Sequence, residues 1–83
     1  MSTLHDQIIQ IQVLREQLRY HHPDIDTRLV RWGLAVVNAK RREWLLDRIQ
    51  NRPEKEQWWW VRQFLPDAAI PVLVRKLTEL TNL

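Results

Sequence analysis

The sequence predicts an all-α protein, and three features carry that prediction. Apolar residues recur every three or four positions through most of the 83 residues, which is the spacing of one face of an α-helix. The chain has one glycine and four prolines, too few for the turns that an all-β chain needs roughly every 8–12 residues. The prolines, at positions 23, 53, 66 and 71, lie between the periodic stretches, where helices end. We therefore expect one domain, residues 1–83, forming a small bundle of four helices with a long central second helix.

The first helix is expected from Leu4 to Tyr20. Thr3 can cap it, because Asp6 follows at the spacing of a capping box. A second, narrower apolar stripe, which contains Ile9 and Val13, lies about half a turn from the main one and meets either later helices or a partner chain. The main apolar stripe, expected to face the core, consists of Leu4, Ile8, Ile11, Leu14 and Leu18.

The central helix is the element on which the others are expected to pack. Pro23 ends the first helix, and Asp24 is a strong N-cap for the second, which contains the stretch from Arg28 to Arg52. The apolar stripe drifts, because the apolar residues of the second half lie more than a quarter turn from those of the first. We expect one long helix with a bend at Gly33 or at Asn38–Ala39, although a break at either place would also fit.

Two shorter helices are expected to follow. The first runs from Glu54 to Leu65, and the second opens at Pro71 and ends near Thr81. Three consecutive tryptophans in the first of these helices point about 100° apart, so they cannot form one aromatic patch. Trp58 and Trp60 are expected in or beside the core, and Trp59 is expected to be exposed.

An orthogonal bundle of five or six helices is the alternative architecture. It requires Gly33 to divide the central helix and residues 67–70 to form an extra turn. By size and helix content this alternative resembles the death-fold adaptor domains, and no sequence motif adds to that resemblance.

Charge is distributed unevenly along the chain, whose net charge is +3. Residues 1–27 carry four acidic and two basic residues, residues 28–52 carry two acidic and seven basic ones, and residues 53–83 carry four of each. Arg28, Arg31 and Arg42 recur with Asn38 at helical spacing, so they should form a basic ridge on the central helix. Such an uneven charge distribution indicates which partners the chain can bind and gives no information about its fold.

Catalytic, metal-binding and cofactor-binding patterns are not evident. The chain has no cysteine and only one serine, and no histidine lies beside a candidate nucleophile, so no enzymatic activity is expected. His21, His22, Asp24 and Asp26 lack the spacing of metal ligands, and no cofactor is expected. No apolar run approaches the ~18 residues of a transmembrane helix and no signal-peptide pattern is present, so a cytoplasmic location is expected.

These features favour a non-catalytic protein–protein interaction or adaptor domain that associates with itself. The acidic first helix of one copy would meet the basic ridge of another, so binding should weaken with salt. The alternative is a nucleic-acid-binding protein whose ridge contacts phosphates and whose exposed tryptophan stacks on a base. The candidate interaction residues are Arg28, Arg31, Arg42, Trp59, Ile9, Val13 and Glu16.

Overall fold

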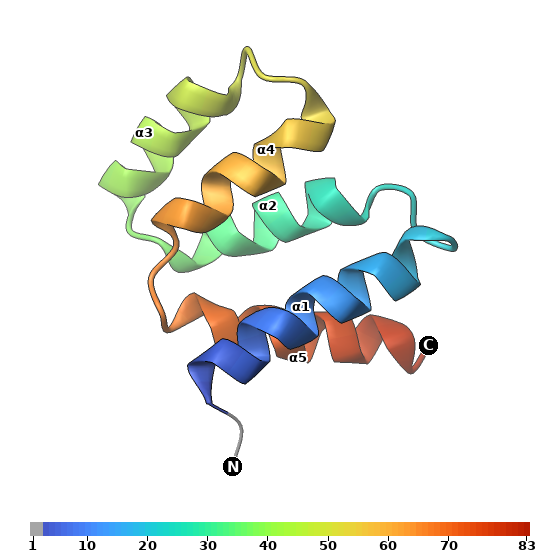
Figure 1. Ribbon diagram of the computed structural model, residues 1–83. Coiled ribbons are helices and arrows are strands. Elements are labelled where there is room, and N and C mark those ends of the chain that lie inside the picture. The colour runs from blue at the N-terminus through green and yellow to red at the C-terminus, as the bar shows by residue number, and fades with distance from the viewer. Residues whose placement is uncertain (1–2) are drawn as a thin grey trace.

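Five α-helices and a short 3₁₀ turn make up residues 3–83, the part of the chain that the computed structural model describes (Figure 1). The all-α prediction is confirmed. The predicted count of four helices is wrong, and the five of the alternative are present, because the expected central helix is two helices. The elements are α1 (Leu4–Arg19), α2 (Ile25–Val36), α3 (Ala39–Ile49), α4 (Glu54–Val61), η1 (Arg62–Phe64) and α5 (Ala69–Thr81).

The break between α2 and α3 falls at Val37 and Asn38, not at Gly33. Val37 has extended backbone angles of φ −82° and ψ 159°, and the Asn38 side-chain oxygen accepts a hydrogen bond from the Arg41 N–H at 2.8 Å. Gly33 lies inside α2, where a Cβ atom would come within 3.0 Å of the Leu65 side chain. The drifting apolar stripe is therefore accommodated by a change of helix, which lets α2 and α3 each bury one side.

The helices begin close to the predicted positions, but only some of them are capped in the predicted way. The predicted capping box of α1 is confirmed, because Thr3 Oγ1 accepts from the Asp6 N–H at 3.0 Å and Asp6 Oδ2 accepts from the Thr3 N–H at 3.3 Å. Asp24 precedes α2 as predicted, but its carboxylate does not cap the helix and accepts instead from Arg28 Nε at 2.9 Å. The last helix, α5, starts two residues before Pro71, which is tolerated in a first turn because the N–H groups there need no intrahelical partner.

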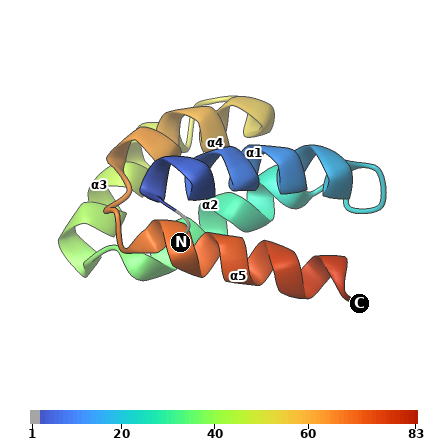
Figure 2. The ribbon, with the colours of Figure 1, turned by 60° about the horizontal axis from the view of Figure 1, so that its bottom comes forward.

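The helices pack mainly in two pairs. Figures 1 and 2 show α1 alongside α5, running in the same direction, and α2 alongside α4. The α1–α5 pair packs on α2, and α3 lies at the opposite edge of the molecule, where it contacts α2 and α4. This arrangement leaves one side of α1 and one side of α3 uncovered.

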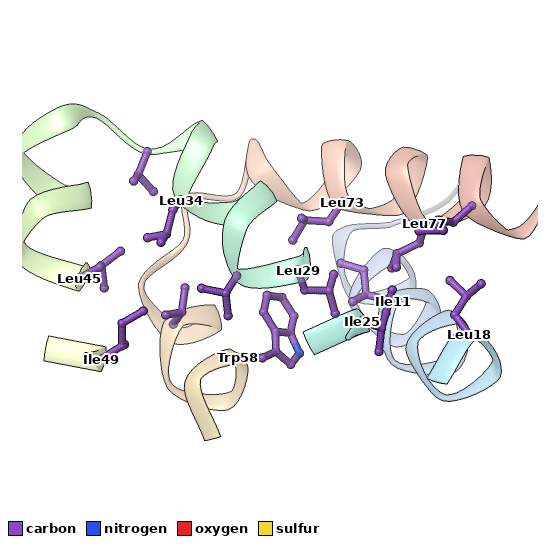
Figure 3. Close-up of a cluster of buried hydrophobic side chains, with 14 residues drawn as sticks. Ile11, Leu18, Ile25, Leu29, Leu34, Leu45, Ile49, Trp58, Leu73 and Leu77 are labelled. Atoms are coloured by element: carbon purple, nitrogen blue, oxygen red, sulfur yellow. The ribbon is translucent and has the colours of Figure 1, made fainter. Parts of the chain in front are cut away.

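The core of the described residues is one cluster of fourteen buried apolar side chains (Figure 3). Trp58, 2% exposed, lies in the middle of the cluster, with Ile25 and Ile11 on one side and Ile49 on the other. Trp60 is partly buried against the same cluster. The prediction that these two tryptophans lie in or beside the core is therefore confirmed.

Candidate interaction surfaces

The outer side of α1 is apolar and exposed. Ile9 and Val13, one turn apart, are each 48% exposed. Leu4 and Ile8 are 38% and 40% exposed, so the predicted core stripe is buried only from Ile11 onward. We refer to Ile9 and Val13 as the α1 face.

A hollow of about 200 Å³ lies on another side of α1, between α1, the end of α4 with η1, and the start of α5. Its lining is mainly apolar and includes Ile8, Ile11 and Ile70. Two donors that belong to the same lining, Nε1 of Trp58 and Nε of Arg62, are buried without a hydrogen-bond partner among residues 3–83. An unpaired buried donor costs about 1–3 kcal/mol.

Arg15 is the only buried charged residue of residues 3–83, and it ties α1 to α2. Its Nε and Nη2 atoms donate to Asp26 at 2.5 and 3.0 Å, and its Nη1 atom donates to Glu16 at 3.2 Å. The hydrogen bonds to Asp26 are the main reason that the pKa of Arg15 lies above its ordinary value. The guanidinium carbons of Arg15 and Arg62 lie 5.5 and 4.0 Å from the centre of the Trp59 ring, which is 43% exposed. Trp59 is therefore held at the α1–α4 contact by cation–π interactions.

The predicted ridge of Arg28, Arg31 and Arg42 is not a continuous surface, because the helix ends between Arg31 and Arg42. Arg42 turns back from α3 and caps the C-terminal end of α2. Its Nε atom donates to the Leu34 carbonyl at 2.7 Å and its Nη2 atom to the Val37 carbonyl at 3.0 Å. Arg31 alone of the three is exposed, so the expected three-residue basic site is absent in that form.

The acidic residues of the first segment are also engaged within the chain. Asp24 pairs with Arg28, and the hydrogen bond from Arg28 is the main cause that lowers the pKa of Asp24 below its ordinary value. The Glu16 side chain, 61% exposed, lies 3.2 Å from Arg15 and 3.9 Å from Arg19. Neither surface of the predicted charge-matched contact therefore has the expected form.

An aromatic cluster that was not predicted from the sequence covers part of α3, α4 and η1. Trp44 stacks on Trp60, with ring centres 5.9 Å apart and planes at 29°. Phe64 packs against Trp44 at 5.2 Å and against Trp60 at 4.7 Å. Trp44 remains 40% exposed. The four-residue spacing of Trp60 and Phe64 predicts that these two meet on one helix side, but Trp44 joins them only through the packing of α3 on α4.

Three arginines surround this cluster. The guanidinium carbons of Arg41 and Arg48 lie 5.9 and 5.3 Å from the Trp44 ring centre, and that of Arg52 lies 5.0 Å from the Trp60 ring centre. Within the described range none of these three arginines makes an ion pair. Two open hollows of about 410 Å³ each, both bordered by Arg41, adjoin the cluster. We refer to the three rings and the three arginines as the arginine–aromatic face.

Two other kinds of site are absent from the described residues. No group of three or more His, Asp and Glu side chains able to hold a metal ion is found between residues 3 and 83. None of the helices in that range combines the length and the apolar character needed to cross a membrane.

Comparisons of the chain with protein-family models, curated proteins and solved structures found no match in any of the three. The resemblance to death-fold domains therefore rests on size and helix content alone.

Proposed function

We propose that this chain is a non-catalytic protein–protein interaction domain that associates with a second copy of itself through the α1 face. The observation that supports the proposal most is the exposure of Ile9 and Val13, at 48% each, on a helix whose sides are otherwise rich in glutamine. Branched side chains of this kind favour a helix less than glutamine does, so helix formation does not explain them. Burial of their apolar surface contributes roughly 25 cal/mol per Å².

A second copy of α1 fits this face by symmetry. A two-fold interface uses the same patch on both partners. Two α1 helices that cross antiparallel at the level of residue 11 would place Ile9 of each copy against Val13 of the other. The two residues lie at equal distances along the helix from that level, so both contacts form together.

The dimer is expected to be weak. One pair of helices buries less than the ~1,000 Å² of a stable interface, and association costs at least about 4 kcal/mol in lost freedom of motion. We expect a Kd of about 0.1–1 mM. Because Asp24, Glu16 and Arg42 are already engaged within the chain, the Kd should depend little on salt. That expectation replaces the salt-sensitive contact predicted from charge distribution alone.

Sedimentation equilibrium from about 10 μM to about 1 mM, a range that spans the expected Kd, tests the proposal. The wild-type mass should rise from the 10.2 kDa of one chain toward about twice that value. The double variant Ile9→Gln with Val13→Gln should stay at 10.2 kDa, while its melting temperature at low concentration is unchanged or raised, because glutamine favours the helix.

The matched control is Arg75→Gln with Glu79→Gln, two exposed positions one turn apart on another helix, α5. This control variant should dimerise like the wild type. A wild-type chain that stays monomeric at ~1 mM, or a double variant that dimerises equally well, would contradict the proposal.

A further inference from the structure

We propose that the arginine–aromatic face binds single-stranded nucleic acid, independently of the α1 face. The face joins an exposed indole, Trp44, to three arginines that have no ion-pair partner within residues 3–83. Proteins that hold single strands combine these two elements, because rings stack on unpaired bases and cations neutralise the phosphates.

Trp44 supplies the surface on which a base would stack. One neighbour of its ring is Trp60, stacked at 29°. Arg41 and Arg48 lie 5.9 and 5.3 Å from its centre, and it remains 40% exposed. The guanidinium on Trp59 lies closer, at 4.0 Å, and occupies that ring directly. The two indoles are similarly exposed, at 40% for Trp44 and 43% for Trp59, but both arginines beside Trp44 lack an ion pair among residues 3–83, whereas Arg15 beside Trp59 is paired with Asp26.

The arginines supply contacts for the phosphates. Arg41 and Arg48 lie seven residues apart on α3, which is about 10 Å along the helix axis. Because both guanidiniums border the Trp44 ring, they would contact phosphates on either side of a base stacked on it. Arg52, above Trp60, extends the line of positive charge toward the end of α3. Three such contacts predict a slope of about −2 for log K against log salt with a single strand.

The structure favours a single strand over other anionic partners. The bases of a duplex already stack on one another and offer no free ring face to Trp44. An acidic protein segment would satisfy the arginines but would leave the exposed indole without a stacking partner. Single strands satisfy both parts of the face.

Fluorescence anisotropy with a labelled mixed-sequence RNA or DNA 12-mer tests the inference, with the matching duplex and poly-glutamate as competitors. The single strand should bind with a salt slope of about −2 and should quench tryptophan fluorescence. Duplex and poly-glutamate should compete poorly. Absence of binding at low salt would overturn the inference, and so would equal competition by poly-glutamate, which would assign the face to an acidic protein.

Matched variants locate the site. Trp44→Ala should weaken binding by roughly 5- to 150-fold, whereas Trp59→Ala, at the other exposed indole, should not. Arg48→Ala should reduce the salt slope by about 0.7, whereas Arg75→Ala, exposed on α5, should leave it unchanged. The Arg48 side chain makes no hydrogen bond or ion pair within residues 3–83, so its variant tests the face even if Trp44→Ala unfolds. Wild-type affinity in both Trp44→Ala and Arg48→Ala would overturn the assignment.

The test does not depend on self-association. Because the Ile9→Gln and Val13→Gln variant should bind the strand normally, a monomeric wild-type chain would leave this inference standing.

Discussion

Arg15 shows how one residue can join two helices in so small a protein. Its guanidinium is buried, and Asp26 from α2 accepts two of its hydrogen bonds. A buried ion pair adds little net stability relative to apolar residues of the same size, because both charges lose water. The loss of Asp26 is costly, since the buried guanidinium then keeps only the largely exposed Glu16 as a partner.

Asp26→Ala should therefore lower the free energy of unfolding by about 1.5–3 kcal/mol, measured by urea denaturation, because Arg15 loses its hydrogen bonds to Asp26 and keeps the one to Glu16. The apolar replacement of both partners, Arg15→Met with Asp26→Leu, should recover most of that loss. Asp47→Ala, at an exposed position on α3, is the control and should change the free energy by less than about 0.5 kcal/mol. If the single and the double variant lost the same free energy of unfolding, the ion pair itself would stabilise the fold, which would contradict this prediction.

Asp24 gives a prediction for pH. The hydrogen bond from Arg28 lowers the pKa of Asp24 below its ordinary value of 3.8. A carboxyl group with a lowered pKa in the folded state stabilises the fold above its unfolded pKa, and this contribution is lost as pH falls through the folded pKa. Arg28→Gln should therefore raise the pKa of Asp24 toward 3.8 and reduce the acid dependence of stability below about pH 4. NMR titration of the Asp24 carboxyl carbon measures this, and an unchanged pKa would exclude Arg28 as the cause.

At the scale of the element, the junction of α2 and α3 determines the architecture. Asn38 caps the start of α3, and Arg42 caps the end of α2, so hydrogen-bonding groups at both new helix ends find partners. Arg42 thus acts on a helix that ends several residues before it. Glycine favours a helix less than valine or asparagine does, so propensity alone would place the break at Gly33. The two caps explain why the chain turns at Val37 and Asn38 instead.

Arg42→Leu should destabilise the protein by about 1.5–3 kcal/mol, because carbonyl groups at the end of α2 lose a charged donor. Lys40→Leu on the same helix is exposed and should change the free energy of unfolding by less than about 0.5 kcal/mol. Chemical denaturation of the two variants makes the comparison. A neutral Arg42→Leu would mean that water replaces the lost contacts.

Sequence periodicity predicted much of the fold and less of the surface. It predicted the all-α class, the capping box at Thr3 and the exposure of Trp59, because each depends on neighbours within one helix. It identified the stripe of Ile9 and Val13 but did not decide whether later helices cover it, and the structure leaves it exposed. It did not decide between a bent and a broken central helix, because a drifting stripe fits both. It also missed the cluster at Trp44, whose partner Trp60 lies on another helix, at a distance that only packing determines.

At the scale of the whole molecule, the small size of the chain limits how much apolar surface it can bury. A chain of 83 residues buries only roughly 60–65% of its unfolded surface, so its core is thin. The α1 face and the arginine–aromatic face, which is built largely on α3, lie on helices at opposite edges of the bundle (Figure 1). The two surfaces can therefore be occupied without excluding each other, and each proposal can be tested alone.

The most direct test of self-association is an isotope-filtered NOE experiment on an equal mixture of ¹³C-labelled and unlabelled protein at ~1 mM, near the expected Kd. We expect cross-peaks between the methyl groups of Ile9 in one copy and Val13 in the other, with intensities that rise with concentration. The absence of such cross-peaks at that concentration, or intermolecular cross-peaks confined to residues outside α1, would contradict the account.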